Sequence, residues 1–199
     1  NTESLQEQAT ECIGDVAMWM RSNRLQLNTA KTEVLWCTSV RRQHQLPNVP
    51  VQIGSDVVMP VRCVRNLGIY VDSDLSMKTH ISIVVSSCFA AMRQIRSIRR
   101  SVSQSVLKSL VVSLVLTRLD YGCATLAGLP RQQLDRLQSV LNAAARLVYS
   151  ARRRDHVTPL LMDLHWLRVH ERIQFRLAVL VHRCLHESCP VYLARDLQR

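Results

Sequence analysis

The sequence contains few aromatic residues, few glycines and few lysines. Two Phe, four Tyr and three Trp among 199 residues disfavour a function that stacks bases on aromatic side chains. Five Gly and six Pro exclude a collagen-like or linker-like chain. An acidic disordered tail is also excluded, because the apolar share of 47% can fill a core.

A hydrophobic run long enough to cross a bilayer is also missing. The longest uncharged apolar stretch, residues 109–117, is about half of what a spanning helix needs. The N-terminus shows no signal-peptide pattern and begins with Asn1 rather than Met. We therefore expect a fragment of a longer protein that is not secreted and has no membrane partner.

The seven cysteines give no disulfide pattern. Their number is odd, their spacing is irregular, and most lie in apolar periodic segments, as buried free cysteines do. A reducing compartment is therefore expected. His182, Cys184, His186 and Cys189 cluster, but Cys184 points away from the histidines on one helix, so we predict helix-end residues rather than a metal site.

Positive charge is concentrated in the second half of the chain. Lys plus Arg number 26 against 15 Asp plus Glu, and the net charge is +11. Residues 1–75 carry −1 and residues 76–199 carry +12, and all but three of the basic residues are Arg. Because a guanidinium pairs two phosphate oxygens and clustered cations release counterions, the second half is predicted to bind nucleic acid. A solvated basic surface or the rim of a protein interface is the alternative.

Two arginine groups are the strongest candidates for phosphate contacts. The first lies at the expected end of a helix and the second in a linker. They consist of Arg93, Arg96, Arg99 and Arg100, and of Arg152, Arg153 and Arg154. Cations at a helix C-terminus also stabilise the helix dipole, so the first group has a purely structural alternative.

The hydrophobic period changes near Asp74. Before it, the pattern predicts a helix at residues 2–23, a strand at 34–37, a hairpin at 51–59 with its turn at 54–56, and a strand at 64–71 with Gly68 in its middle. After it, four or five helices are predicted, starting near residues 77, 103, 130, 159 and 169. The predicted fold class is α+β and mainly α-helical, with a small partial sheet followed by a helical bundle.

No acidic pair suits two-metal phosphoryl transfer. The sequence has no Asp-Asp dipeptide, and only Asp72 and Asp74 lie close together. Because they fall where a strand gives way to a helix, a turn with charge at the helix N-terminus is the favoured interpretation. No Ser/His/Asp combination, Gly-rich phosphate loop or His-Glu-x-x-His pattern occurs.

Four segments carry a family resemblance. They are WMRSNRLQLNTAKTE (residues 19–33), VRNLGIYVDSDLSMKTHI (64–81), LDYGCATLAGLPRQQLDRLQSVLNAAARLV (119–148) and HVTPLLMDLHWLRVHERIQFRLAVLVHRCL (156–185). In this order they resemble reverse transcriptases of non-LTR (LINE-type) retrotransposons of the jockey and chicken-repeat kind. Two departures are Arg168, where the family often has Pro, and Gly122-Cys123, where Cys-Asn is common.

The resemblance implies part of an RNA-directed DNA polymerase in the nucleus and cytoplasm. It assigns residues 1–75 to the C-terminal part of the palm and residues 76–199 to the thumb and a helical extension. Lys31 matches a palm lysine proposed to protonate the leaving pyrophosphate, and Leu67-Gly68 matches the primer grip. Without the resemblance, a surface lysine and a core strand are the simpler interpretations. The implied partners are an RNA template and DNA primer as a hybrid, with the upstream palm and fingers.

The resemblance also identifies motifs that this sequence lacks. The Tyr-x-Asp-Asp strand and the earlier Asp motif, which hold Mg²⁺ in such polymerases, do not occur here. We therefore expect no cofactor and no polymerase activity from this chain alone, whereas the full-length polymerase would use Mg²⁺. The main alternative is a non-enzymatic basic helical module, derived from a retroelement, that binds nucleic acid or protein. Binding to anionic membranes is a weaker alternative, because the apolar faces are regular enough to form a mutual core.

Overall fold

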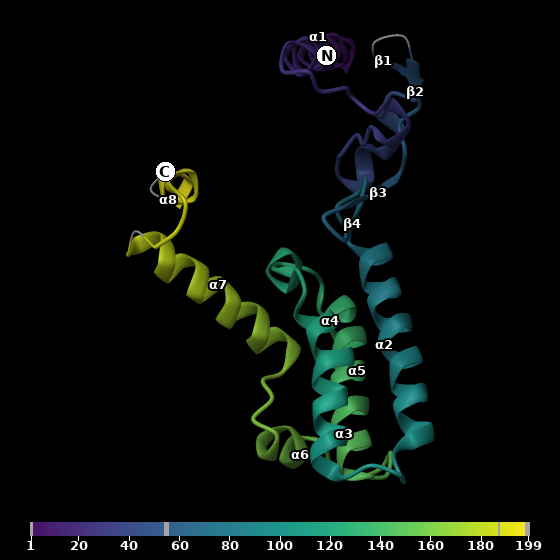
Figure 1. Cartoon of the computed structure of the whole chain (residues 1–199), viewed down its shortest axis with the longest axis vertical. Coiled ribbons are helices and arrows are strands. Elements are labelled where there is room, and N and C mark those ends of the chain that lie inside the picture. The colour runs from purple at the N-terminus through teal and green to yellow at the C-terminus, as the bar shows by residue number, and fades with distance from the viewer. Residues whose placement is uncertain (1, 54–55, 187, 198–199) are drawn as a thin grey trace. The chain divides into compact units, whose positions relative to one another are not determined.

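The computed structural model describes residues 2–53, 56–186 and 188–197. The chain forms two compact units, Asn1–His80 and Ile81–Arg199, and the division falls within the first turn of a helix, slightly beyond residue 75. The chain is 62% helical with two small two-stranded antiparallel sheets, which confirms the predicted α+β, mainly helical class (Figure 1).

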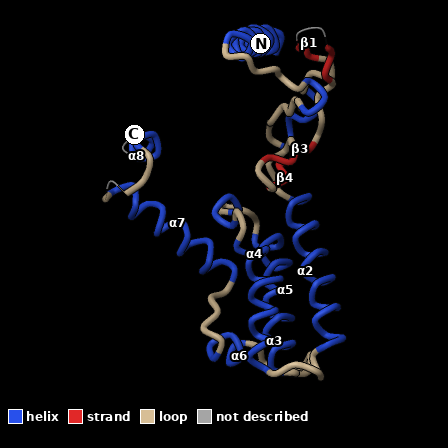
Figure 2. Tube along the Cα trace, viewed as in Figure 1, coloured by secondary structure: helices blue, strands red, loops and turns tan. Residues whose placement is uncertain are grey.

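The first unit combines one helix with two short hairpins. Helix α1 (Thr2–Ser22) ends where the Asn23 amide donates to the Trp19 carbonyl, close to the predicted stop. In the first hairpin, β1 (Val51–Ile53) pairs with β2 (Asp56–Val58), and in the second, β3 (Cys63–Asn66) pairs with β4 (Ile69–Asp72). Figure 2 shows these strands as short red segments. Helix α1 contacts β1, where Val51 and Ile53 are almost fully buried.

The predicted strand at residues 34–37 is wrong. Only Val34 forms a bridge, to Pro60, and the Val34 carbonyl accepts the Val61 N–H at 2.8 Å. The ladder does not extend, since a proline has no N–H to donate. The predicted turn is also one residue too long, because Asp56 belongs to β2; Gly54 and Ser55 lie outside the described residues.

The predicted strand at residues 64–71 is in fact the β3–β4 hairpin. Asn66 pairs with Ile69, which leaves Leu67 and Gly68 as a two-residue turn. Both have positive φ, 48° and 85°, as a type I′ turn requires. Gly68 therefore lies in a turn between two strands and not in the middle of one strand, and Leu67 is 83% exposed at the tip.

Leu67 is a poor residue for this turn, so the hairpin offers a stability test. Asn-Gly is the preferred pair for a type I′ turn, and we expect Leu67→Asn to raise the free energy of unfolding by about 0.5–1 kcal/mol. Gly68→Ala should lower it by about 1 kcal/mol or more, because alanine resists positive φ. Urea denaturation followed by circular dichroism measures both. Equal stability of the two variants would contradict the turn assignment.

The second unit is built from helices. Helix α2 (Lys78–Ile98) leads into it, followed by α3 (Gln104–Val111), α4 (Thr117–Asp120), α5 (Arg131–Tyr149), α6 (Thr158–Asp163), α7 (Val169–Leu185) and α8 (Val191–Leu197). Helix starts near residues 77, 103, 130, 159 and 169 are confirmed, and Ser103 caps α3 by accepting the Val106 N–H. Helix α8 was not predicted from the sequence.

Three neighbouring helical rods form the core of this unit. The rods are α2, the α3–α4 pair and α5, and they alternate in direction as the chain passes down, up and down (Figure 1). Val111, Val140 and Leu141 are fully buried between them. A π-helical turn (Val112–Leu116) joins α3 to α4, and the Cys88 thiol of α2 donates to the Val115 carbonyl within that turn.

The cysteines do not follow the expectation that most are buried. Cys88, Cys123 and Cys184 are buried, whereas Cys12 and Cys37, both in the first unit, are exposed. Burial raises the pKa of the Cys88 thiol, as expected for a cysteine that packs as a small apolar residue. Among the helices described, none has an apolar stretch that is long enough for a membrane span.

Candidate functional site

Both arginine groups lie at one end of the second unit's bundle. Helices α2 and α5 run toward this end, and the α2–α3 and α5–α6 connections turn there (Figure 1). Contacts between rods support this packing, since Arg118 donates to the Ser87 carbonyl and Arg136 to the Ser82 hydroxyl. We call the combined set the arginine end; its members are Arg93, Arg96, Arg99, Arg100, Arg152, Arg153 and Arg154.

The guanidinium groups of the arginine end are open to solvent. Arg99 is half-buried and the other six are exposed. Among the residues that the structure describes, none of the seven side chains has an ion-pair or hydrogen-bond partner. Their charge is therefore available to an external anion.

Acidic residues do little to neutralise this surface. No Asp or Glu occurs between Asp74 and Asp120, a stretch that includes all of α2 and α3. Two nearby carboxylates are already engaged: Asp155 accepts the Arg152 backbone N–H at 2.6 Å, and Asp163 accepts the Tyr149 hydroxyl. The acid-free stretch is a sequence signal that could have strengthened the original prediction.

The helix-dipole alternative explains only part of this arrangement. Cations within the last turn stabilise a helix C-terminus, and Arg96 occupies that turn of α2. Arg93 lies more than a turn from Ile98, and residues 152–154 lie in the connection before α6. A dipole role therefore does not account for the whole arginine end.

The geometry of the arginine end can bind a row of phosphates. Comparisons of the chain with protein-family models, with curated proteins and with solved structures gave no match. Guanidinium groups from the end of α2 and from two connections at the same end of the bundle suit phosphates that repeat along a backbone, because each fork can engage two oxygens.

The other predicted residues, Lys31, Leu67 and Gly68, lie in the first unit. Lys31 ends a 3-10 turn (Thr29–Lys31) and is exposed. Leu67 and Gly68 form the tip of the β3–β4 hairpin. None of the three lines the first unit's main cavity, so the structure does not bring them together around a common pocket.

That cavity, of about 630 Å³, contains Asp72 and Asp74 in its wall, with Arg62, Lys78 and Trp36 nearby. Asp72 accepts the Thr79 N–H and Asp74 accepts the Ser76 N–H, each at 3.0 Å. A hydrogen bond with the Ser76 side chain is the main reason that the pKa of Asp74 is lowered, and the bond from the Ser76 N–H lowers it further.

Both carboxylates thus accept backbone hydrogen bonds at the turn before α2 and at the start of α2, in agreement with the predicted turn and helix N-terminus. They do not fit the Mg²⁺ pair of a polymerase, and no cluster of three or more metal-ligating side chains exists in the described ranges.

His80 is the most buried titratable group beside this turn. It is 4% exposed, its Nδ1 accepts the Tyr70 N–H at 3.5 Å, and the Asp72 carboxylate lies close to it. Burial lowers the pKa of His80, although the nearby Asp72 charge opposes that shift. The folded state therefore favours neutral imidazole.

This shift predicts that acid destabilises the first unit. Above a pH of about 6.5 the histidine is neutral in both states, so its contribution is fully present there. Below that pH the unfolded chain binds the proton more readily, and stability falls. His80→Gln should reduce the fall in unfolding free energy between pH 7 and pH 5, whereas His44→Gln, at an exposed position, should not. If the unfolding free energies of the wild type and of His80→Gln fall in parallel between pH 7 and pH 5, His80 is not the source of the acid sensitivity.

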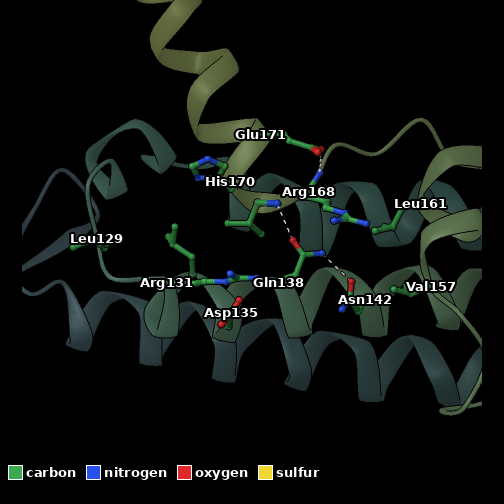
Figure 3. Close-up of a pocket in the computed structure, with 12 residues that line it drawn as sticks. Leu129, Arg131, Asp135, Gln138, Asn142, Val157, Leu161, Arg168, His170 and Glu171 are labelled. Carbon is green, nitrogen blue, oxygen red and sulfur yellow. Dashed lines mark hydrogen bonds between the residues drawn. The ribbon is translucent and has the colours of Figure 1, made fainter.

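A second cavity, of about 620 Å³, lies between α5 and the start of α7 (Figure 3). Gln138 lies at its centre, accepts the Val169 N–H at 2.9 Å and donates to Asn142 at 2.8 Å. Its charged lining is mixed in sign and includes Arg131, Asp135, Arg168 and Glu171. Sequence reasoning missed this contact, because Gln138 and Val169 are 31 residues apart and follow no motif.

Arg168, one departure from the family pattern, has a clear role here. It precedes the first residue of α7, and its backbone N–H donates to the Glu171 carboxylate at 2.7 Å. Proline has no N–H, so the bond depends on a residue other than Pro at this position. The guanidinium of Arg168 also donates to the Thr158 hydroxyl, which links α7 to α6.

The His/Cys cluster lies at the end of α7. The rings of His182 and His186 are in contact, with centroids 4.2 Å apart. Cys184 is buried and hydrogen-bonds Cys189, and this bond is the main reason that its pKa is raised. The cysteine and histidine pairs thus make separate contacts.

Proposed function

We propose that this chain is the part of a non-LTR-type reverse transcriptase that follows the catalytic strand, and that it holds an RNA–DNA hybrid by its phosphates. The arginine end is the observation that carries the proposal. Its guanidinium groups have no partner among the described residues, and they come from the end of α2 and from two connections at the same end of one bundle. Phosphate contacts of this kind hold a duplex in position without reading its sequence.

The composition of the arginine end favours the backbone of the nucleic acid over its bases. Residues 93–108 and 150–157 contain no Phe, Tyr or Trp, so no stacking platform is available there. We therefore expect strong salt dependence and little sequence preference.

Within this proposal the chain contributes binding, and the chemistry belongs to the upstream palm. Lys31 is proposed to act in the whole enzyme as a general acid or cation near the leaving pyrophosphate, and its exposure is compatible with that role. The exposed β3–β4 tip, Leu67-Gly68, is proposed to contact the primer. The chain alone should not extend a primer, since its sequence lacks the Tyr-x-Asp-Asp strand that would hold Mg²⁺.

Reading the coding sequence upstream of the Asn1 codon tests the polymerase part of the proposal. An open frame with a Tyr-x-Asp-Asp-like strand within a few tens of codons is the expected result. A stop codon or an unrelated sequence there would contradict it. Primer extension by the purified chain, abolished by Asp72→Ala, would contradict the division of roles.

A non-enzymatic interaction module is the second candidate function. The observation that favours it is the exposed apolar surface of α7 and α8, where Phe175, Leu185 and Tyr192 are 58%, 63% and 66% exposed. This module would bind a protein partner and tolerate Lys31→Ala. Absence of salt-dependent binding of the hybrid to the unmodified chain would favour this candidate.

A further inference from the structure

Serines lie beside the arginines of the α2–α3 connection. Ser101, Ser103 and Ser105 are all exposed, and Ser103 follows Arg99 by four residues and Arg100 by three. We propose that Ser103 is a phosphorylation site for a serine kinase that selects arginine on the N-terminal side of its acceptor, and that the phosphate weakens nucleic-acid binding. The inference rests on the proposed function, because it concerns regulation of the arginine end.

The conformation of Ser103 suits an acceptor. It lies just before α3 with extended backbone, φ −68° and ψ 160°. Its hydroxyl accepts the Val106 N–H at 3.4 Å and lies 2.9 Å from the Ser105 hydroxyl, so both contacts are local and exposed. By contrast, Ser105 lies within α3, and the Ser101 N–H closes the turn after α2 by donating to the Ile98 carbonyl.

The reaction is an ordinary phosphoryl transfer from a nucleoside triphosphate. The Ser103 Oγ attacks the γ-phosphorus, and a new Oγ–P bond forms while the bond from that phosphorus to the β,γ-bridging oxygen breaks. The nucleoside diphosphate leaves, and the hydroxyl proton passes to the base of the kinase. Arginine upstream of the acceptor is a charge pattern by which a kinase can distinguish substrates.

The phosphate would act directly on the charge of the arginine end. Phosphoserine carries a charge of about −1.5 to −2 at neutral pH and attracts nearby guanidinium groups. Arg99 and Arg100 lie in the same connection and would pair with it, and the start of α3 favours a negative charge at this position. If two arginines pair with the phosphoserine and no longer contact the nucleic acid, the affinity of the chain for the hybrid should fall about 30-fold at about 0.15 M salt.

Phosphorylation of the whole chain tests the site. We would incubate it with ATP and a purified arginine-directed serine kinase, map the phosphate by mass spectrometry, and measure binding to an RNA–DNA hybrid. The expected result is phosphate on Ser103, with affinity reduced about 30-fold. No phosphate on Ser103, while a control peptide is modified by the same kinase, overturns the proposal. So does phosphate on Ser103 with unchanged affinity.

A matched pair of variants isolates the charge. Asp and Asn both cap helices well, so Ser103→Asp and Ser103→Asn should fold alike and differ by one charge. We expect Ser103→Asp to bind the hybrid about fivefold more weakly than Ser103→Asn at about 0.15 M salt. Thr125→Asp and Thr125→Asn, in the turn Cys123–Leu126 at the opposite end of the bundle, should differ less than twofold.

We call the proposed effect of Ser103 phosphorylation on nucleic-acid binding the switch. Equal affinity of Ser103→Asp and Ser103→Asn for the hybrid overturns it. If the unmodified chain shows no salt-dependent hybrid binding, the proposed function fails and the switch fails with it. Phosphate incorporation is scored by mass alone, so it separates failure of the modification site from failure of the proposed function.

Discussion

Replacing Arg93, Arg96, Arg99 and Arg100 together by glutamine should lower the affinity for an RNA–DNA hybrid about a thousandfold at about 0.15 M salt. Each arginine that leaves a phosphate removes about 0.9 from the slope of log K against log salt, so four remove about 3.6. Glutamine preserves helix propensity, so α2 should remain intact. Fluorescence anisotropy of a labelled hybrid, across a series of KCl concentrations, measures both quantities.

A second quadruple variant controls for net charge. Arg131, Arg176, Arg183 and Arg195 are also exposed in the second unit, outside the arginine end. Changing them to glutamine alters the formal charge by the same amount and should reduce the affinity much less. If the two quadruple variants bind equally weakly, the attraction is a diffuse property of a basic unit. If the first variant retains both affinity and slope, the arginine end is not the interface.

Removing Arg172 should destabilise the second unit by about 2 kcal/mol. Its guanidinium bonds both oxygens of Asp120, at 2.6 and 2.8 Å, and thereby joins α7 to α4. The two side chains are only 16% and 27% exposed, so Arg172→Met leaves a poorly solvated carboxylate without its partner. The estimate lies below the cost of breaking a fully buried pair, because some solvent reaches both groups.

Three further variants make this test specific: Asp120→Asn alone, Asp120→Asn with Arg172→Met, and Lys78→Met. Asp120→Asn combined with Arg172→Met should cost less than the sum of the two single changes, since each single change leaves a lone charge and the double variant leaves none. Lys78→Met removes an exposed pair, in which Nζ lies 3.9 Å from Asp74, and should cost less than about 0.5 kcal/mol. Urea unfolding followed by circular dichroism gives all four values. Additive losses at residues 120 and 172 would show that the pair is not coupled.

Helices were predicted better than strands because their patterns are longer. An apolar face repeated over several turns marks α2, α5 and α7, and Ser103 and Pro130 mark two starts. The strands contain only three or four residues, too few to show a period. The sequence therefore places Gly68 in the middle of a strand, although positive φ at Leu67 and Gly68 makes it half of a turn. The sequence gives little warning that leucine would adopt that conformation.

The arginines of the candidate site were predicted from the sequence, but their location at one end of the bundle was not. The arginines of both groups stand out in the sequence, yet 52 residues separate Arg100 from Arg152. Only the packing of α2, α3 and α5 brings the two connections to the same end. The Asp120–Arg172 pair and the Gln138–Val169 bond were missed for a related reason: each joins residues far apart in the chain, and neither has a local pattern.

Titration of the unmodified chain with an RNA–DNA hybrid, over a range of salt concentrations, tests the central claim most directly. If most of the seven arginines contact phosphates, log K should fall against log salt with a slope between about −4 and −6. Random hybrid sequences should give the same curve, because the contacts are to the backbone. A slope shallower than about −1, or no binding at low salt, would contradict the account of the arginine end as a nucleic-acid interface.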